Sequence, residues 1–316
     1  MSRRKWISVW VALGVFLCVI LPLTCLQVGL ALGPGRGTVA RGWGDAVAVV
    51  RVEGIITSGR EQGWPTSTTG NAYSESIVET LRRAEDDPSV KAIVLRVNSP
   101  GGGIVPSNEI FQALARMEKP IVVSMGDTAA SGGYYISCAA DKIVANAATL
   151  TGSIGVIATA PNLEELLDKI GIEMLIIKSG ALKDELSPYR GPSEEEIRHW
   201  QGIVDEAYEQ FVEVVAQGRN LSLDEARDLA DGRVYTGQQA LDVGLVDVLG
   251  NTPEAVSLAA ELGGIEGEPR TIEYQRPPTL IEALLSALTR AQGPASLDEL
   301  LGIERHFTIQ YLFVSP

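Results

Sequence analysis

A serine lies where a predicted buried strand ends and a predicted helix begins, which is a favourable place for a nucleophile. The apolar run Ile121–Met125 predicts the strand, and Gly132–Cys138 predicts the helix that Ser131 precedes. Backbone N–H groups and the positive end of a helix dipole face a developing anion at such a turn. Gly132 and Gly133 carry no Cβ atom, so a substrate carbonyl can approach the backbone closely. The pattern favours nucleophilic attack by Ser131, and an ordinary turn is the alternative.

A serine hydroxyl needs a neighbouring base, and the chain offers few candidates. His199 lies in a strongly charged helical segment and His306 lies near the C-terminus, so neither has the setting of a catalytic base. A lysine is the natural substitute for histidine in this role. Lys178 and Lys183 both follow an apolar, strand-like segment and lie in a loop that contains glycine. Site residues often lie in such loops, so both lysines are candidates.

A lysine acts as a base only while its amine is neutral. Because the reference pKa is ~10.4, the neutral form is disfavoured by ~4.6 kcal/mol at pH 7. Burial in an apolar pocket lowers the pKa of a lysine and can remove most of that cost. A lysine base in this protein therefore requires a dry pocket around its amine.

Five motifs occur in the same order as in a known protease family. They are Asn98–Gly103, Ala129–Tyr135, Leu150–Val156, Ser179–Asp184 and Ala230–Gly237. From about Asp45 to Gly250 the sequence therefore resembles bacterial signal peptide peptidase A, a membrane-bound Ser/Lys protease of the ClpP/crotonase superfamily. One copy of the motifs is present, as in the short, single-repeat form of that family.

The resemblance implies a role for each residue of the predicted site. Ser131 matches the nucleophile, Lys183 matches the general base, and Ser153 matches the hydroxyl that orients the lysine. The oxyanion hole is matched by three glycines, namely Gly101, Gly102 and Gly132. The sequence contains no metal-binding cluster, phosphate loop or nucleotide motif, so we expect neither a metal nor a cofactor.

The elements that must position these residues alternate between strand and helix. Ala92–Val97 predicts a strand that leads into the Asn98–Gly103 motif, and Ser74–Ala84 predicts an amphipathic helix before it. Such an alternation with short links predicts parallel strands with right-handed crossovers, whose carboxyl ends gather the site. The resemblance specifies the fold further as an α/β superhelix of repeated ββα units like that of ClpP and crotonases.

Three capping-box patterns predict helices in the second half of the chain. They are Ser193 with Glu196, Ser222 with Glu225, and Thr236 with Gln239. The first opens a long helix with an apolar stripe, which we interpret as a packing surface for the core or for another subunit. We interpret Asp231–Thr236 as a turn between helices without chemistry of its own.

The N-terminus predicts a membrane anchor. Ser2–Lys5 is basic, and Trp6–Leu32 is an uncharged apolar run, longer than the ~20 residues that span a bilayer. This order predicts a single-pass protein of the cell membrane, with a cytoplasmic N-terminus and an extracytoplasmic catalytic domain. A cleaved signal peptide ending near Ala31–Gly33 is the alternative.

The chain divides into four predicted parts. Residues 1–33 form the cytoplasmic start and the transmembrane anchor, 34–44 a linker, 45–264 the protease domain, and 265–316 a tail. The tail contains an amphipathic helix candidate at Leu280–Leu288, which is too short to span a membrane. The net charge of -14 argues against nucleic acid as a partner.

The resemblance implies an endopeptidase that degrades remnant signal peptides and similar apolar peptides outside the cytoplasm. It also implies a ring-like homo-oligomer, an octamer in the short form, in which neighbouring subunits shape the groove. Two other classes remain as alternatives, a catalytically silent scaffold of the same fold and a crotonase-type acyl-CoA enzyme. A ClpP-type peptidase would need a histidine base, and the charged surroundings of His199 disfavour it.

Overall fold

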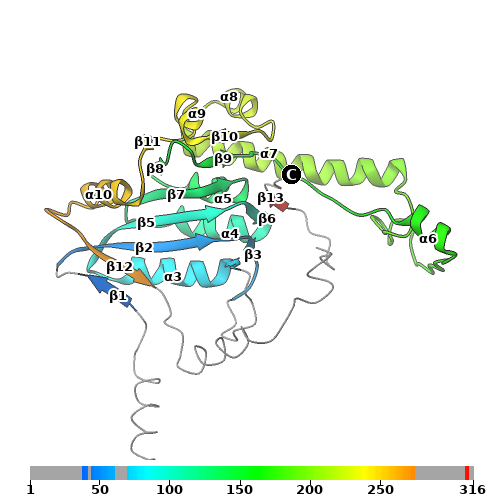
Figure 1. Ribbon diagram of the computed structural model, residues 1–316, viewed down its shortest axis with the longest axis horizontal. Helices are drawn as coiled ribbons and strands as arrows, with labels where there is room; N and C mark the ends of the chain where they lie inside the picture. The colour runs from blue at the N-terminus through cyan, green and yellow to red at the C-terminus, as the bar shows by residue number, and fades with distance from the viewer. Residues whose placement is uncertain (1–37, 42–43, 61–69, 275–309, 313–316) are drawn as a thin grey trace, which may run out of the picture.

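The computed structural model describes residues 38–41, 44–60, 70–274 and 310–312. These form an α/β fold around a nine-stranded sheet, whose main path runs β1-β12-β2-β5-β7-β8-β11 (Figure 1). The central strands are β2 (Ala46–Glu53), β5 (Val90–Ser99), β7 (Ile121–Ala130) and β8 (Lys142–Ala145). Each pairs in parallel with the next, so the predicted parallel sheet is confirmed.

Alternate residues of the strands build two hydrophobic cores on opposite faces of the sheet, because successive side chains of a strand point to opposite sides. On β5, Ile93, Leu95 and Val97 belong to the larger core. This core also contains residues of α3 (Ser74–Asp86), α4 (Ile104–Leu114), α5 (Gly132–Ser137) and α7 (Glu194–Arg219). Ala92 and Val94 belong to the smaller core, which α10 (Thr252–Leu262) covers.

The carboxyl ends of three parallel strands meet at one edge of the sheet. Ser99 at the end of β5 lies opposite Ala129 of β7, and Ala130 lies opposite Gly152 of β9 (Leu150–Gly152). The chain leaves these ends into α4, into α5 and into the loop that begins at Ser153. This edge therefore gathers the three segments that carry the predicted serines and glycines.

A small second sheet lies beside this edge. Its strands run in the order β13-β6-β3-β4, and they are β13 (Gln310–Leu312), β6 (Gly101–Gly103), β3 (Ile56–Thr57) and β4 (Ala72–Tyr73). β13 comes from the C-terminal tail and pairs antiparallel with β6, with Tyr311 opposite Gly102. The tail therefore reaches the motif that was predicted to form the oxyanion hole.

Two further strands extend the main sheet at its β2 edge. β12 (Arg270–Tyr274) pairs in parallel with β2, and β1 (Thr38–Arg41) pairs antiparallel with β12. Both lie outside residues 45–264, the range predicted for the protease domain.

The second half of the chain has the three predicted helix starts. The capping boxes at Ser193, Ser222 and Thr236 open α7, α8 (Leu223–Asp228) and α9 (Gly237–Asp242). The prediction for Asp231–Thr236 was wrong in part, because Val234–Thr236 forms strand β10, which pairs antiparallel with β9. A three-residue strand forms only through its pairing with another strand, so the local sequence pattern does not predict it.

Residues 157–192, which we call the arm, extend away from the sheet together with the first turns of α7 (Figure 1). The arm contains one described helix, α6 (Glu164–Ile170), which has no buried residue. Many of its apolar side chains are exposed, and Leu175 and Ile177 reach 87% and 90%. An apolar surface of this kind is typical of a protein interface.

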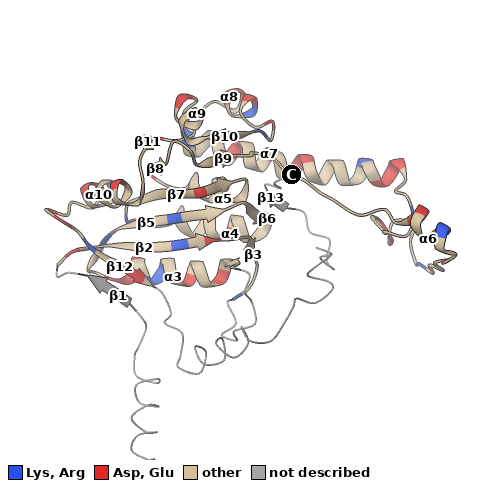
Figure 2. Cartoon of the chain, viewed as in Figure 1, with Lys and Arg blue, Asp and Glu red and all other residues tan. Residues whose placement is uncertain are grey.

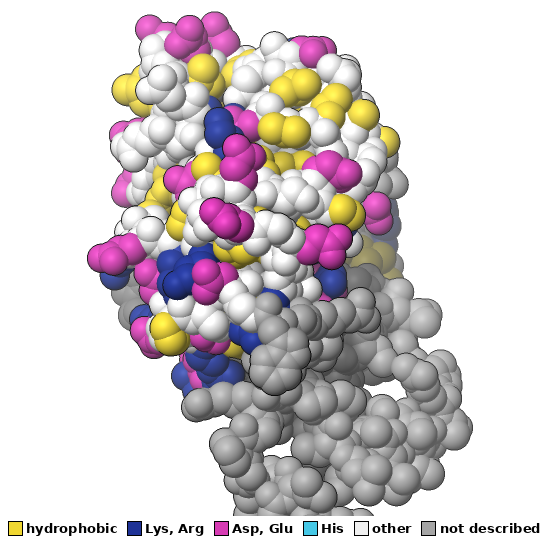
Figure 3. Space-filling model, turned by 90° about the vertical axis from the view of Figure 1, so that its left-hand side faces the viewer, with side chains coloured by type: hydrophobic (Ala, Val, Ile, Leu, Met, Phe, Trp, Pro, Cys, Tyr) yellow, Lys and Arg dark blue, Asp and Glu magenta, His cyan; other side chains and the backbone are white. Residues whose placement is uncertain are grey.

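Charged residues lie along the helices and on the arm, and a few lie in the central strands (Figure 2). Acidic side chains are scattered over the face seen in Figure 3 rather than gathered in one patch. No helix in the described ranges is long and apolar enough to cross a membrane. The predicted anchor at Trp6–Leu32 and the helix candidate at Leu280–Leu288 lie outside those ranges.

Candidate active site

Ser131 occupies a sharp turn between β7 and α5. Its backbone has φ 53° and ψ -118°, a conformation that residues with a side chain rarely adopt. Two hydrogen bonds hold it, since its N–H donates to the Gly152 carbonyl at 2.8 Å and its carbonyl accepts from Tyr135 N–H at 2.8 Å. The residue is 1% exposed. Strained residues that their surroundings fix in this way cluster at active sites.

The predicted oxyanion glycines lie next to this turn. A Cβ atom added at Gly132 would lie 3.2 Å from both Gly101 Cα and Gly102 N. Gly101 has φ 105°, and its N–H donates to Ser99 Oγ at 3.1 Å. The structure therefore brings all three glycines together beside Ser131, with a backbone approach that only residues without a side chain allow.

Ser153 is joined to the same turn through its neighbour. Gly152, which accepts the Ser131 N–H, immediately precedes it, and Ser153 itself has a positive φ of 49°. Its own N–H donates to the Arg233 carbonyl at 2.8 Å. The structure thus brings Ser131 and Ser153 together through the backbone of β9.

The Asp231–Thr236 motif supports Ser153, a role that the sequence analysis missed. Arg233 accepts the Ser153 N–H, and Gly232 N–H donates to the Ile154 carbonyl at 3.1 Å. Asp231 fixes the Arg233 side chain by an ion pair. The ordered recurrence of this motif with the other four was the signal that it belongs to the site.

Lys183 lies on the arm, apart from the nucleophile of its own chain. Its side chain is exposed, and its N–H donates to the Gly180 carbonyl at 3.3 Å. Figure 1 shows the arm extending beyond α5, so a single chain does not bring the predicted base to Ser131. The dry pocket that a lysine base requires is not formed by the described part of one chain.

Lys178 is engaged elsewhere. Its ammonium donates to Asp184 Oδ1 at 2.6 Å and to the Ala181 carbonyl at 2.8 Å. This ion pair holds the Lys178 ammonium within the arm, which disfavours Lys178 as the base.

The two histidines offer no alternative base in the described residues. His199 lies near the start of α7, where Nε2 is 4.0 Å from Glu185 Oε2. His306 lies outside the described ranges.

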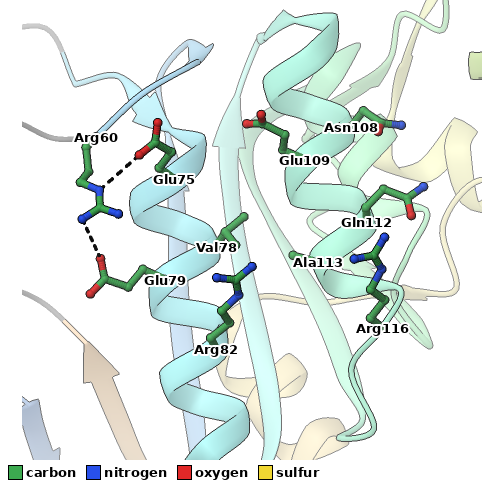
Figure 4. A pocket seen from close by; sticks show the side chains of 10 residues that line it. All are labelled: Arg60, Glu75, Val78, Glu79, Arg82, Asn108, Glu109, Gln112, Ala113 and Arg116. Carbon is green, nitrogen blue, oxygen red and sulfur yellow. Dashed lines mark hydrogen bonds and ion pairs between the residues drawn. The ribbon is translucent and has the colours of Figure 1, made fainter.

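A hollow between α3 and α4 lies on another part of the surface (Figure 4). Arg60 forms ion pairs with Glu75 and Glu79 of α3 at one side of it, and Arg82 and Arg116 also line it. Its lining contains no nucleophile, so we assign no reaction to it.

Comparison with known proteins identifies the family of this site. The model of Peptidase family S49 matches residues 113–266, and that of Clp protease matches residues 65–153. A protein of Enterococcus faecium named as a signal peptide peptidase SppA is 39% identical, over 81% of this chain and 80% of that relative. The chain belongs to peptidase family S49. It is a serine peptidase.

Two other relatives of this S49 peptidase differ in how much of their own length the match covers. A protein of Synechocystis named as a protease is 41% identical, over 73% of this chain and 80% of that relative. Protease 4 of Salmonella typhi is 38% identical, over 82% of this chain but 41% of that relative. The resemblance drawn from the five motifs is confirmed, whereas the role of each site residue stays a prediction.

Proposed function

We propose that this S49 peptidase is a membrane-anchored endopeptidase that cleaves remnant signal peptides and similar apolar peptides with a Ser131/Lys183 dyad. The observation that carries the proposal is the turn at Ser131, a strained and buried serine flanked by the three backbone glycines. A nucleophile beside convergent N–H groups is the arrangement that acyl transfer requires.

The reaction follows from these positions. Lys183 takes the proton of the Ser131 hydroxyl as its oxygen attacks the scissile carbonyl. The N–H groups of Gly102 and Gly132 stabilise the tetrahedral oxyanion, with Gly101 shaping the backbone around them. Lys183 then protonates the leaving amine, and water releases the acyl group.

We infer that Lys183 reaches Ser131 of a neighbouring subunit in a ring-like homo-oligomer. Three observations support this arrangement: the arm extends away from its own sheet, it carries Lys183, and its apolar side chains are exposed. Packing of these side chains against another copy would bury the arm and supply the dry surroundings that a neutral lysine needs. An octamer is the subunit number implied by the short form of the family.

The pairing of β13 with β6 supports an extended peptide as substrate. β6 carries the oxyanion glycines, and its edge opposite β3 pairs with the extended segment β13 in antiparallel register. Main-chain pairing of this kind recognises peptides without demanding one sequence. Apolar remnants of signal peptides fit such a groove.

We place the peptidase in the cell membrane, with the catalytic part outside the cytoplasm. The basic Ser2–Lys5 followed by the apolar Trp6–Leu32 supports a single-pass anchor in this orientation.

Hydrolysis of a leucine-rich fluorogenic peptide by the full chain in detergent tests the proposal. We expect Ser131→Ala and Lys183→Ala each to abolish turnover. We expect Lys91→Ala, a lysine change at the start of β5 and away from both the arm and the Ser131 turn, to leave turnover unchanged. Turnover that survives Lys183→Ala would reject the dyad. Inactivity of the folded wild-type oligomer would favour the scaffold instead.

Mixing the two inactive variants tests the arrangement between subunits. If the dyad forms between copies, dissociated and reassembled mixtures of Ser131→Ala and Lys183→Ala recover part of the wild-type turnover. A mixture that remains inactive would place both residues of the dyad in one chain.

A further inference from the structure

One arginine joins a carboxylate in the loop that carries Lys183 to a carboxylate at the start of α7. Arg190 Nε donates to Asp184 Oδ2 at 3.0 Å and Nη2 to Asp184 Oδ1 at 2.8 Å. Its Nη1 donates to Glu196 Oε2 at 2.9 Å, and Nη2 also reaches Glu196. We call Asp184, Arg190 and Glu196 the clamp.

The side chains of the clamp, from the arm and the start of α7, are better shielded from solvent than most of the arm. The side chains of Glu196, Asp184 and Arg190 are 2%, 11% and 28% exposed. Arg190 also donates to the backbone, to the Asp184 carbonyl at 3.2 Å and to the Gly191 carbonyl at 3.1 Å. It therefore fixes the main chain directly after Lys183 as well as the carboxylate.

The clamp is tied to the start of α7. Glu196 is the third helical residue, and its carboxylate also accepts the N–H of Ser193 in the capping box. Lys178 also contacts Asp184, with Nζ 2.6 Å from Oδ1. The loop on both sides of Lys183 is thus closed on itself and attached to a long helix.

The charges of the clamp persist at working pH. Arg190 holds the pKa of Asp184 well below its usual range. Hydrogen bonds from Arg190, and next from the Ser193 N–H, lower the pKa of Glu196 to about 2. The clamp therefore does not titrate near neutrality, and it can serve as a constant support.

We infer that Arg190 is a positioning residue for Lys183. Held by Asp184 and Glu196, it presets the loop before the arm meets the Ser131 turn of another copy. The inference rests on the proposed role of Lys183 as the base. A preset loop loses less conformational entropy on docking and delivers the amine within the narrow limits that proton transfer demands.

The same helix offers a matched control. Arg198 pairs with Glu194 through one contact of 3.5 Å, and the side chains are 71% and 93% exposed. An exposed pair of this kind contributes little, whereas the fork of Arg190 binds two carboxylates that lysine cannot reach together.

The first test compares Arg190→Lys, Arg190→Gln and Arg198→Gln in the full-chain oligomer. We expect both Arg190 variants to lose about 10²-fold in kcat, with little change in KM, because a displacement near 1 Å costs this much. Arg198→Gln should match wild type. An Arg190→Lys enzyme with wild-type kcat would overturn the inference.

The second test does not depend on turnover. We expect amide hydrogen exchange across residues 178–191 to quicken by tenfold or more in Arg190→Gln and to stay unchanged in Arg198→Gln. Unchanged hydrogen exchange in Arg190→Gln would overturn the inference that Arg190 fixes this loop. Faster exchange in a protein whose Lys183→Ala variant still turns over would instead retain the clamp and reject the proposed base.

A double mutant Asp184→Asn/Arg190→Gln that loses no more kcat than either single variant would show that the two act as one unit.

Discussion

At the scale of single residues, Gly102 occupies a place where no side chain fits. A Cβ atom there would lie 2.0 Å from the Ile56 carbonyl oxygen and 2.6 Å from Ile56 N. Both are backbone atoms of β3, which cannot turn aside as a flexible side chain does. The tight pairing of β3 with β6 is therefore what fixes the direction of the Gly102 N–H.

We predict that Gly102→Ala lowers kcat by about 10²- to 10³-fold, the usual loss when one oxyanion donor is removed. The added methyl group pushes β6 away from β3 and turns the N–H away from the developing charge. Gly202→Ala in α7 is the control, because nothing lies within 4 Å of the added Cβ. Peptide hydrolysis by the two variants measures the difference, and equal rates would contradict the prediction.

At the scale of elements, α7 links the arm to the body of the molecule. The apolar face of its second half is buried, and Phe211 packs edge-on against Tyr135 of α5 with ring centroids 5.1 Å apart. At its last turn the backbone of Gly218 lies against α5, where an added Cβ would be 2.2 Å from the Cys138 carbonyl oxygen. The helix that carries Glu196 of the clamp is therefore seated on the helix that begins after Ser131.

We predict that Gly218→Ala destabilises the protein by about 1–3 kcal/mol, as overpacking in a core typically does. Gly202→Ala in the exposed first half of α7 should instead stabilise it by about 0.5–1 kcal/mol, because nothing lies near the added methyl and alanine favours helix. Urea unfolding of both variants provides the measurement. A destabilised Gly202→Ala or a neutral Gly218→Ala would speak against this packing.

Local patterns predicted the elements whose character is set within a short stretch of chain. The apolar run at Ala92–Val97 became β5, and the capping boxes became helix starts, because side-chain alternation and N-cap hydrogen bonds act within a few residues. β10 and β12 were not predicted, since each is a strand only through its pairing with a distant segment. The grouping of Ser131 with the glycines followed from strand ends, whereas the position of the arm follows from no local rule.

At the scale of the whole molecule, the tail returns to the site. β13 occupies the edge of β6 at which an extended peptide would pair, and it belongs to the same chain. A tethered segment competes at a high effective concentration. We therefore expect a substrate peptide to pair with β6 only when it displaces β13.

We predict that Tyr311→Pro lowers KM several-fold and leaves kcat unchanged, because proline removes a backbone N–H and is poorly tolerated within a paired strand. The measurement is the concentration dependence of peptide hydrolysis by the full chain. Pro316→Ala, beyond the strand, serves as the control. A KM that stays the same or rises in Tyr311→Pro would mean that β13 does not compete with substrate.

The arm gives this peptidase a form of restraint that needs no removable propeptide. In a single copy the nucleophile and the proposed base lie apart. Such a copy would therefore be inactive until it meets another copy. If the proposed membrane anchor and the proposed dyad between copies both hold, peptidase activity would rise with the surface density of copies in the bilayer and would fall away where copies are sparse.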